Sequence, residues 1–197
     1  MMNNEEKSQL ANQVQTDVSL ISFLSVVSVF FIGALLPQFN SYDASVRIPI
    51  SFLIVSTFAF IFSGLILSNA TQRINQGDLQ RTEKHLAYGY AISEYMGVFL
   101  FVLSVPIAMS IVTTDLYLRV ITFVAAIVGI SVYQFGGFSL LGNHFSKSNI
   151  LFAIITVLFG VVLFLSQTFA FHFTVIATLF LLFMLAITIL APMKSFQ

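Results

Sequence analysis

Long runs of hydrophobic residues alternate with short polar links along this chain. Six runs, at roughly residues 18–37, 46–69, 86–112, 117–141, 149–167 and 171–191, come near the ~20 residues that a helix needs to cross a hydrocarbon core of about 30 Å. The alternating segments of a transmembrane β-barrel are not seen. Because backbone amides in lipid must be bonded within their own segment, the pattern predicts continuous helices.

The links between neighbouring runs are short, so consecutive helices are expected to run antiparallel. The sequence predicts an all-α integral membrane protein, a bundle of six transmembrane helices built from three antiparallel hairpins. We expect a polar N-terminal segment at 1–17, a transmembrane domain at 18–191 and a short tail at 192–197. The one long link contains Gly77 and Asp78, a turn and an N-cap, so the third helix is expected to start near Leu79.

Lysine and arginine are distributed unequally over the two sides of this topology. Six fall on the side of the termini, namely Lys7, Arg73, Arg81, Lys84, Lys147 and Lys194. Arg47 and Arg119 fall on the other side. The positive-inside rule therefore predicts that both termini are cytoplasmic. We expect a multi-pass protein of a cell membrane, and the minimal loops favour a prokaryotic plasma membrane.

Composition supports membrane embedding and excludes several classes of function. Hydrophobic residues make up 58% of the chain and charged residues 8%, with a mean hydropathy of +0.97. A soluble domain carries about 25% charged residues and could not cover its surface at this composition. The net charge is zero and there is no basic stripe, so we expect no nucleic-acid partner. The absence of cysteine excludes thiolate metal sites.

Glu94 interrupts the third hydrophobic run, about six residues and 9 Å beyond the expected point of membrane entry. On a regular helix Tyr90, Glu94 and Ser104 share a face with small residues such as Gly97. A helix can approach closely over such a face, so Glu94 is expected to face protein rather than lipid. Gln134 of the fourth run lies near the same depth, and we expect it to form a hydrogen bond with Glu94.

Two interpretations of Glu94 stay open at this point. It is either a proton- or cation-binding carboxylate on a transport path, or a polar clamp that fixes helix pairing. A charge within the membrane costs free energy, on the order of 2–3 kcal/mol at a helix centre and less near the interface. The shallow predicted depth of Glu94 favours the clamp.

Charged pairs open the second and fourth runs. Asp43 and Arg47, and likewise Asp115 and Arg119, are spaced i,i+4, so each pair is expected to form an ion pair at a helix end. His85 and His144 are expected on the cytoplasmic side and His172 on the outer side. No three-histidine site can form in this topology, and we expect no metal.

The sequence favours two classes of function. There is no Walker A loop, metalloprotease motif, nucleophile elbow or dinucleotide fingerprint, so we expect no enzyme and no cofactor. Scarce polar groups favour a structural or accessory subunit that packs in the lipid bilayer against other membrane chains or copies of itself. The alternative is a small carrier or channel for a proton, a cation or an apolar solute, with Glu94 as its ionisable element.

Overall fold

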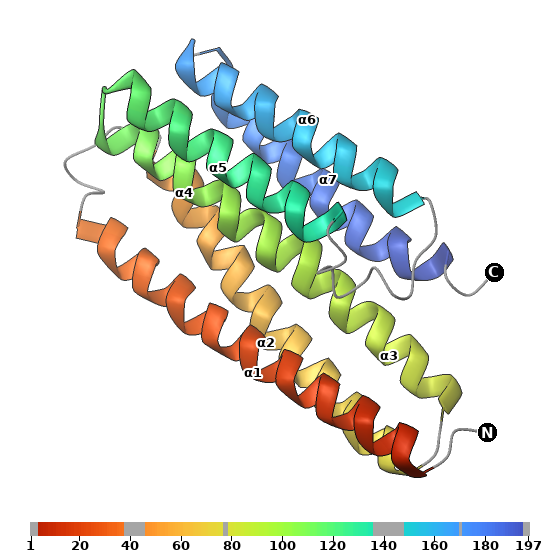
Figure 1. Cartoon of the computed structure of the whole chain (residues 1–197). Helices are drawn as coiled ribbons and strands as arrows, with labels where there is room; N and C mark the ends of the chain where they lie inside the picture. Colours follow the sequence, from red (N-terminus) through yellow and green to blue (C-terminus); the bar gives the residue numbers. More distant parts are fainter. Residues whose placement is uncertain (1–3, 38–45, 77–78, 136–147, 170, 195–197) are drawn as a thin grey trace.

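A computed structural model describes residues 4–37, 46–76, 79–135, 148–169 and 171–194. The regular structure in these ranges is helical, and a single π-helix lies within the third pass, the continuous helical stretch from Leu79 to Val112 (Figure 1). The elements are α1 (Asn4–Leu35), α2 (Arg47–Gln76), α3 (Leu79–Ala91), η3 (Ile92–Val98, the π-helix), α4 (Phe99–Val112), α5 (Leu116–Phe135), α6 (Ser148–Thr168) and α7 (Phe173–Lys194).

The helices have the length and composition of membrane spans. Among the described residues, five stretches qualify: Glu5–Leu35, Arg47–Ile74, Thr82–Val112, Leu116–Tyr133 and Phe173–Leu190. Helix α6 has 21 residues, and its stretch Ile154–Thr168 is apolar but shorter. The helices overlap all six predicted runs and are those of a polytopic membrane protein.

The first three passes are longer than the hydrophobic runs that predict them. Helix α1 begins at Asn4, so most of the predicted polar segment 1–17 continues the helix of the first pass. Glu5 and Glu6 lie in its first turn, where negative charge is favourable. Helix α2 continues to Gln76, beyond its predicted end near residue 69, and α3 begins at Leu79 as expected.

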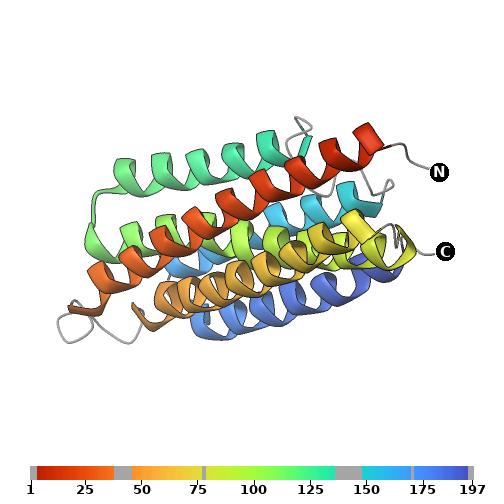
Figure 2. The same cartoon turned by 90° about the horizontal axis from the view of Figure 1, so that it is seen from below.

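Helix α2 and the third pass (α3, η3 and α4) form the centre of the bundle. Helix α2 packs against α1, α3, η3, α4 and α7, whereas α4 also packs against α5 and α6. Figure 2 shows α1 and α5 on one side of this central layer and α7 on the other. Half of the apolar window of α2 is buried inside the protein, compared with 11% for α1 and for α5. Helices α1 and α5 therefore lie at the edges.

Aromatic side chains fill much of the core between the central helices and α7. Phe52 of α2 lies against Phe180 of α7 with ring centroids 5.8 Å apart, and Phe159 of α6 lies 5.7 Å from Phe180. Tyr95 of η3 packs edge-on against Phe99 at 5.6 Å. Burial of such rings contributes strongly to packing between the central helices.

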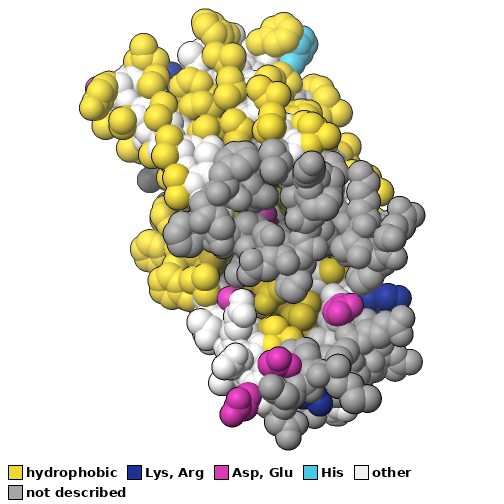
Figure 3. Space-filling view, turned by 45° about the vertical axis from the view of Figure 1, so that its right-hand side comes forward, with side chains coloured by type: hydrophobic (Ala, Val, Ile, Leu, Met, Phe, Trp, Pro, Cys, Tyr) yellow, Lys and Arg dark blue, Asp and Glu magenta, His cyan; other side chains and the backbone are white. Residues whose placement is uncertain are grey.

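Polar and apolar surfaces are separated along the bundle. In the space-filling view of Figure 3, most visible acidic and basic side chains gather toward one end, and hydrophobic side chains cover much of the remaining described surface. The exposed hydrophobic residues include Phe23, Phe30, Val128 and Leu158, each more than half exposed. A bilayer covers such a surface, whereas water would not.

The third pass and α2 approach so closely that two glycines have no room for a side chain. A Cβ atom on Gly97 would lie 2.5 Å from a ring carbon of Phe60, and one on Gly89 would lie 2.7 Å from a methyl carbon of Leu67. Glycine at a helix contact lets two backbones come together in this way. By contrast, a Cβ atom on Gly129 would meet no heavy atom within 4 Å.

We expect Gly97→Ala to destabilise the protein by about 1–3 kcal/mol, because the buried ring of Phe60 cannot move aside without strain. Gly129→Ala, the matched control, should leave stability unchanged or raise it slightly, since alanine favours helix. Thermal unfolding in mild detergent measures both. Equal unfolding temperatures for the two variants would contradict this account of the contact.

Candidate functional site

The third pass changes from α-helix to π-helix at the position of Glu94. The π-helix η3 covers Ile92–Val98, and the backbone N–H of Phe99 donates to the carbonyl of Glu94, five residues earlier. The side chain of Glu94 has an exposed fraction of 0%. π-Helical segments are rare and are frequently found at functional sites. A fully buried carboxylate on such a segment is therefore the leading candidate site.

Two serines of α2 bind backbone carbonyls of the third pass, one before the π-helix and one within its last residues. The hydroxyl of Ser56 donates to the carbonyl of Gly97 at 2.9 Å, and that of Ser63 donates to the carbonyl of Gly89 at 2.7 Å. Both serines are fully buried. The close approach at the two glycines brings their carbonyls within reach of α2, so η3 is attached to the neighbouring helix near both of its ends.

Further polar groups lie beside Glu94 in the sequence. The hydroxyls of Ser93 and Tyr95 are buried, and neither has a hydrogen-bond partner among the described residues. A buried hydroxyl without a partner costs free energy, and such groups require an explanation such as an ion or a water. Ser93 and Tyr95 therefore carry hydroxyl groups that make no hydrogen bond with the described part of the protein.

Tyr90, one turn before Glu94, connects the third pass to α1. Its hydroxyl donates to Oδ2 of Asp17 at 2.8 Å. Asp17 is partly exposed and Tyr90 is buried, with an exposed fraction of 3%. The sequence predicts a polar role for Tyr90 but does not identify Asp17 as its partner.

The other residues predicted to lie near Glu94 divide into two cases. Ser104 is buried, but its hydroxyl donates to the carbonyl of Phe101 within its own helix. Gln134 lies on α5 as expected, but its side chain is outside the described residues, so its hydrogen bond with Glu94 stays a prediction. The predicted common face of Tyr90, Glu94 and Ser104 assumed a uniform α-helix, and the π-helix changes the register between them.

The predicted ion pairs at the helix ends also stay predictions. Asp43 lies outside the described residues, and Arg47 is the first residue of α2. Oδ1 of Asp115 accepts a hydrogen bond from the backbone N–H of Leu118 at 3.0 Å, so this carboxylate caps the start of α5. Nε of Arg119 is buried without a hydrogen-bond partner among the residues that the structure describes.

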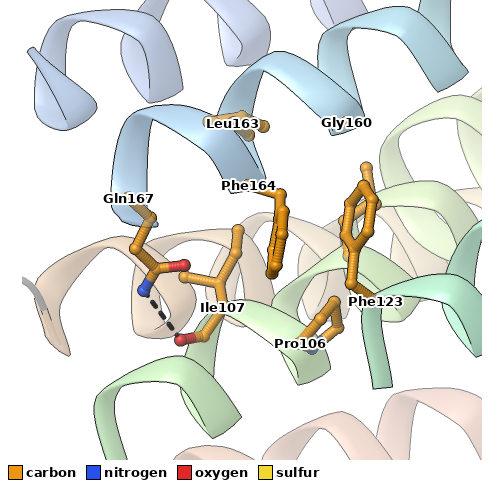
Figure 4. A pocket seen from close by; sticks show the side chains of 8 residues that line it. Pro106, Ile107, Phe123, Gly160, Leu163, Phe164 and Gln167 are labelled. Atoms are coloured by element: carbon orange, nitrogen blue, oxygen red, sulfur yellow. Dashed lines mark hydrogen bonds between the residues drawn. The ribbon is translucent and has the colours of Figure 1, made fainter. Parts of the chain in front are cut away.

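A small pocket lies between α4, α5 and α6. Figure 4 shows Gln167 donating from Nε2 to the carbonyl of Ile107 at 3.0 Å, next to Pro106. The rings of Phe123 and Phe164 stack at 4.4 Å on another wall. Its volume of about 10 Å³ is close to the minimum that one water molecule needs. It is too small for a larger solute.

The described part of the chain contains no cluster of three or more histidine, cysteine or acidic side chains that could hold a metal ion. His144 lies outside the described residues, so its predicted place on the side of the termini stays a prediction. The carboxylate oxygens of Glu94 are the hard ligands at this position, and such oxygens suit a proton or a small hard cation.

Comparisons with family models, with curated proteins and with solved structures found no match. The site is therefore assessed from its own geometry.

We expect Tyr90→Phe to lower stability by about 1–2 kcal/mol, because it removes the donor to Asp17 and keeps the ring. Tyr88→Phe is the matched control, since Tyr88 lies on the same helix with 37% of its surface exposed. Thermal unfolding in detergent compares the two variants. A loss of equal size in both would show that the hydrogen bond with Asp17 contributes nothing specific.

Proposed function

We propose that Glu94 reversibly binds a proton or a small cation, and that the protein is a small membrane carrier or channel. The observation that carries this proposal is the complete burial of the Glu94 side chain on a π-helical segment of the central pass. Sequence alone favours the polar clamp, because it predicts a shallow position for Glu94. Complete burial and the irregular helix shift the balance toward the ion-binding role.

The argument rests on the cost of a buried charge. A carboxyl group within a membrane protein is stable only when it is protonated, or when a cation or a set of donors compensates its charge. The neighbouring hydroxyls of Ser93 and Tyr95 have unused capacity among the described residues. As sequence neighbours of Glu94 they add buried polar groups to the same turn, where an ion or a water can satisfy them.

An accessory role is the second candidate, and a specific observation favours it. Only 11% of the apolar windows of α1 and α5 is buried inside the protein. Such helices have large surfaces available to other membrane chains or to a second copy of this one. In that case Glu94 is a polar clamp between helices.

For the arrangement in the membrane we propose three antiparallel hairpins with both termini in the cytoplasm, in a prokaryotic plasma membrane. The unequal distribution of lysine and arginine supports this orientation. Impermeant labelling of single cysteines at residues 2 and 196 in sealed inside-out vesicles should modify both, and right-side-out vesicles should protect both. Modification of the two ends from opposite faces would overturn an even number of crossings.

We expect Glu94→Gln to reduce ion flux at least tenfold in proteoliposomes, because it keeps the shape of the side chain and removes its titratable group. Flux is followed with an internal pH dye under an imposed membrane potential, and sodium and potassium movement are measured in parallel. Glu83→Gln is the matched control, since Glu83 is an exposed carboxylate on α3.

Two outcomes would contradict the carrier. One is flux in the parent protein no greater than in protein-free vesicles, and the other is unchanged flux in Glu94→Gln. A membrane protein recovered in constant stoichiometry with the chain after mild detergent extraction would then support the accessory role.

A further inference from the structure

The two serine–glycine hydrogen bonds join segments of unequal length. Ser56 and Ser63 are seven residues apart on α2, whereas Gly89 and Gly97, whose carbonyls they bind, are eight residues apart on the third pass. The helices run antiparallel here, because the earlier serine binds the later glycine. Seven residues of one helix are therefore matched to eight residues of the other.

A regular α-helix cannot satisfy this match. At 3.6 residues per turn, residues seven apart return to nearly the same face, within about 20°, whereas residues eight apart differ by about 80°. Gly89 and Gly97 nevertheless both face α2, as their contacts with Leu67 and Phe60 show. The π-helix Ile92–Val98 begins three residues after Gly89 and includes Gly97, and its wider turn accommodates the additional residue.

We propose that Ser56 and Ser63 are positioning residues for Glu94, which hold the third pass in its π-helical register. This inference rests on the proposed function of Glu94 for its purpose, but its geometry is independent of what Glu94 binds. The two hydrogen bonds fix Gly89, before η3, and Gly97, within it, so a separation of eight residues must fit the length of two turns. The wide turn then presents the side chain of Glu94 to the protein interior.

The neighbouring hydroxyls of α2 do not act in this way. Thr57 is also buried, but its hydroxyl donates to the carbonyl of Leu53 in the same helix, at 2.8 Å. The hydroxyl of Ser51 donates to the carbonyl of Arg47, again within α2. Ser56 and Ser63 therefore differ from these residues in reaching across to another helix.

The first test follows the reactivity of Glu94 in the full-length protein. A hydrophobic carbodiimide, such as dicyclohexylcarbodiimide, adds to a protonated carboxyl group in an apolar site and leaves a stable acylurea that mass spectrometry locates. We expect Ser56→Ala with Ser63→Ala to lower labelling of Glu94 at least fivefold in membranes, because the released segment no longer holds the carboxyl group in its apolar position. Ser56→Thr with Ser63→Thr should restore labelling, and Thr57→Val should not change it.

The second test keeps the proposal falsifiable if the serine variants do not fold. Deletion of Ile92 shortens the separation of the two glycines from eight positions to seven, so a regular α-helix then matches the two serines. We expect this deletion to retain a cooperative unfolding transition close to that of the parent. Deletion of Val102, within the regular helix α4, rotates the following residues by about 100° and should abolish the transition.

The results separate the inference from the proposed function. Unchanged labelling in the double alanine variant, or equal damage from the two deletions, overturns the positioning role whatever the flux of Glu94→Gln. If the serine and deletion results agree with expectation while Glu94→Gln retains full flux, the positioning role stands and the carrier function fails.

Discussion

The backbone of the third pass touches α2 at two glycines, and the rest of the central bundle depends on this close approach. Phe60 and Leu67 occupy the space that side chains at Gly97 and Gly89 would need. The carbonyls of the same glycines accept hydrogen bonds from Ser56 and Ser63. In a bilayer no water is available to satisfy a backbone group at an irregular turn, so donors from a neighbouring helix stabilise the departure from regular bonding. The π-helix and the burial of Glu94 follow from that stabilisation.

The division into central and edge helices places the polar groups where protein surrounds them. Glu94, Ser93 and Tyr95 lie on the central pass and are fully buried, whereas α1 and α5 are largely exposed. A carboxylate on an edge helix would meet lipid, where an ionised group is costly and has no donors. Asp17 is the informative case at the edge. It lies on α1, but its carboxylate accepts a hydrogen bond from Tyr90 of the central pass.

The sequence predicts most of the helices because hydrophobic runs and turn residues are local signals. Helix α4 ends at Val112, where the third run ends, and α3 begins at Leu79, after the expected turn. The surroundings of Glu94 are harder to predict from local sequence signals. Periodicity assumes 3.6 residues per turn, so it cannot reveal that α2 selects a wider turn around Glu94. The bond between Tyr90 and Asp17 joins residues 73 positions apart, and only tertiary packing brings them together.

The third pass contains two irregular features, the π-helix η3 and Pro106 within α4. Pro106 lies inside α4 and has no N–H to donate to the carbonyl of Val102, and Gln167 of α6 donates to the carbonyl of Ile107, the next residue. The segment from Phe99 to Val105 thus lies between two places where a neighbouring helix donates a hydrogen bond to the backbone. Ser56 of α2 attaches one end and Gln167 of α6 the other. Side chains of two different helices therefore hold the third pass, one at its π-helix and the other beside its proline.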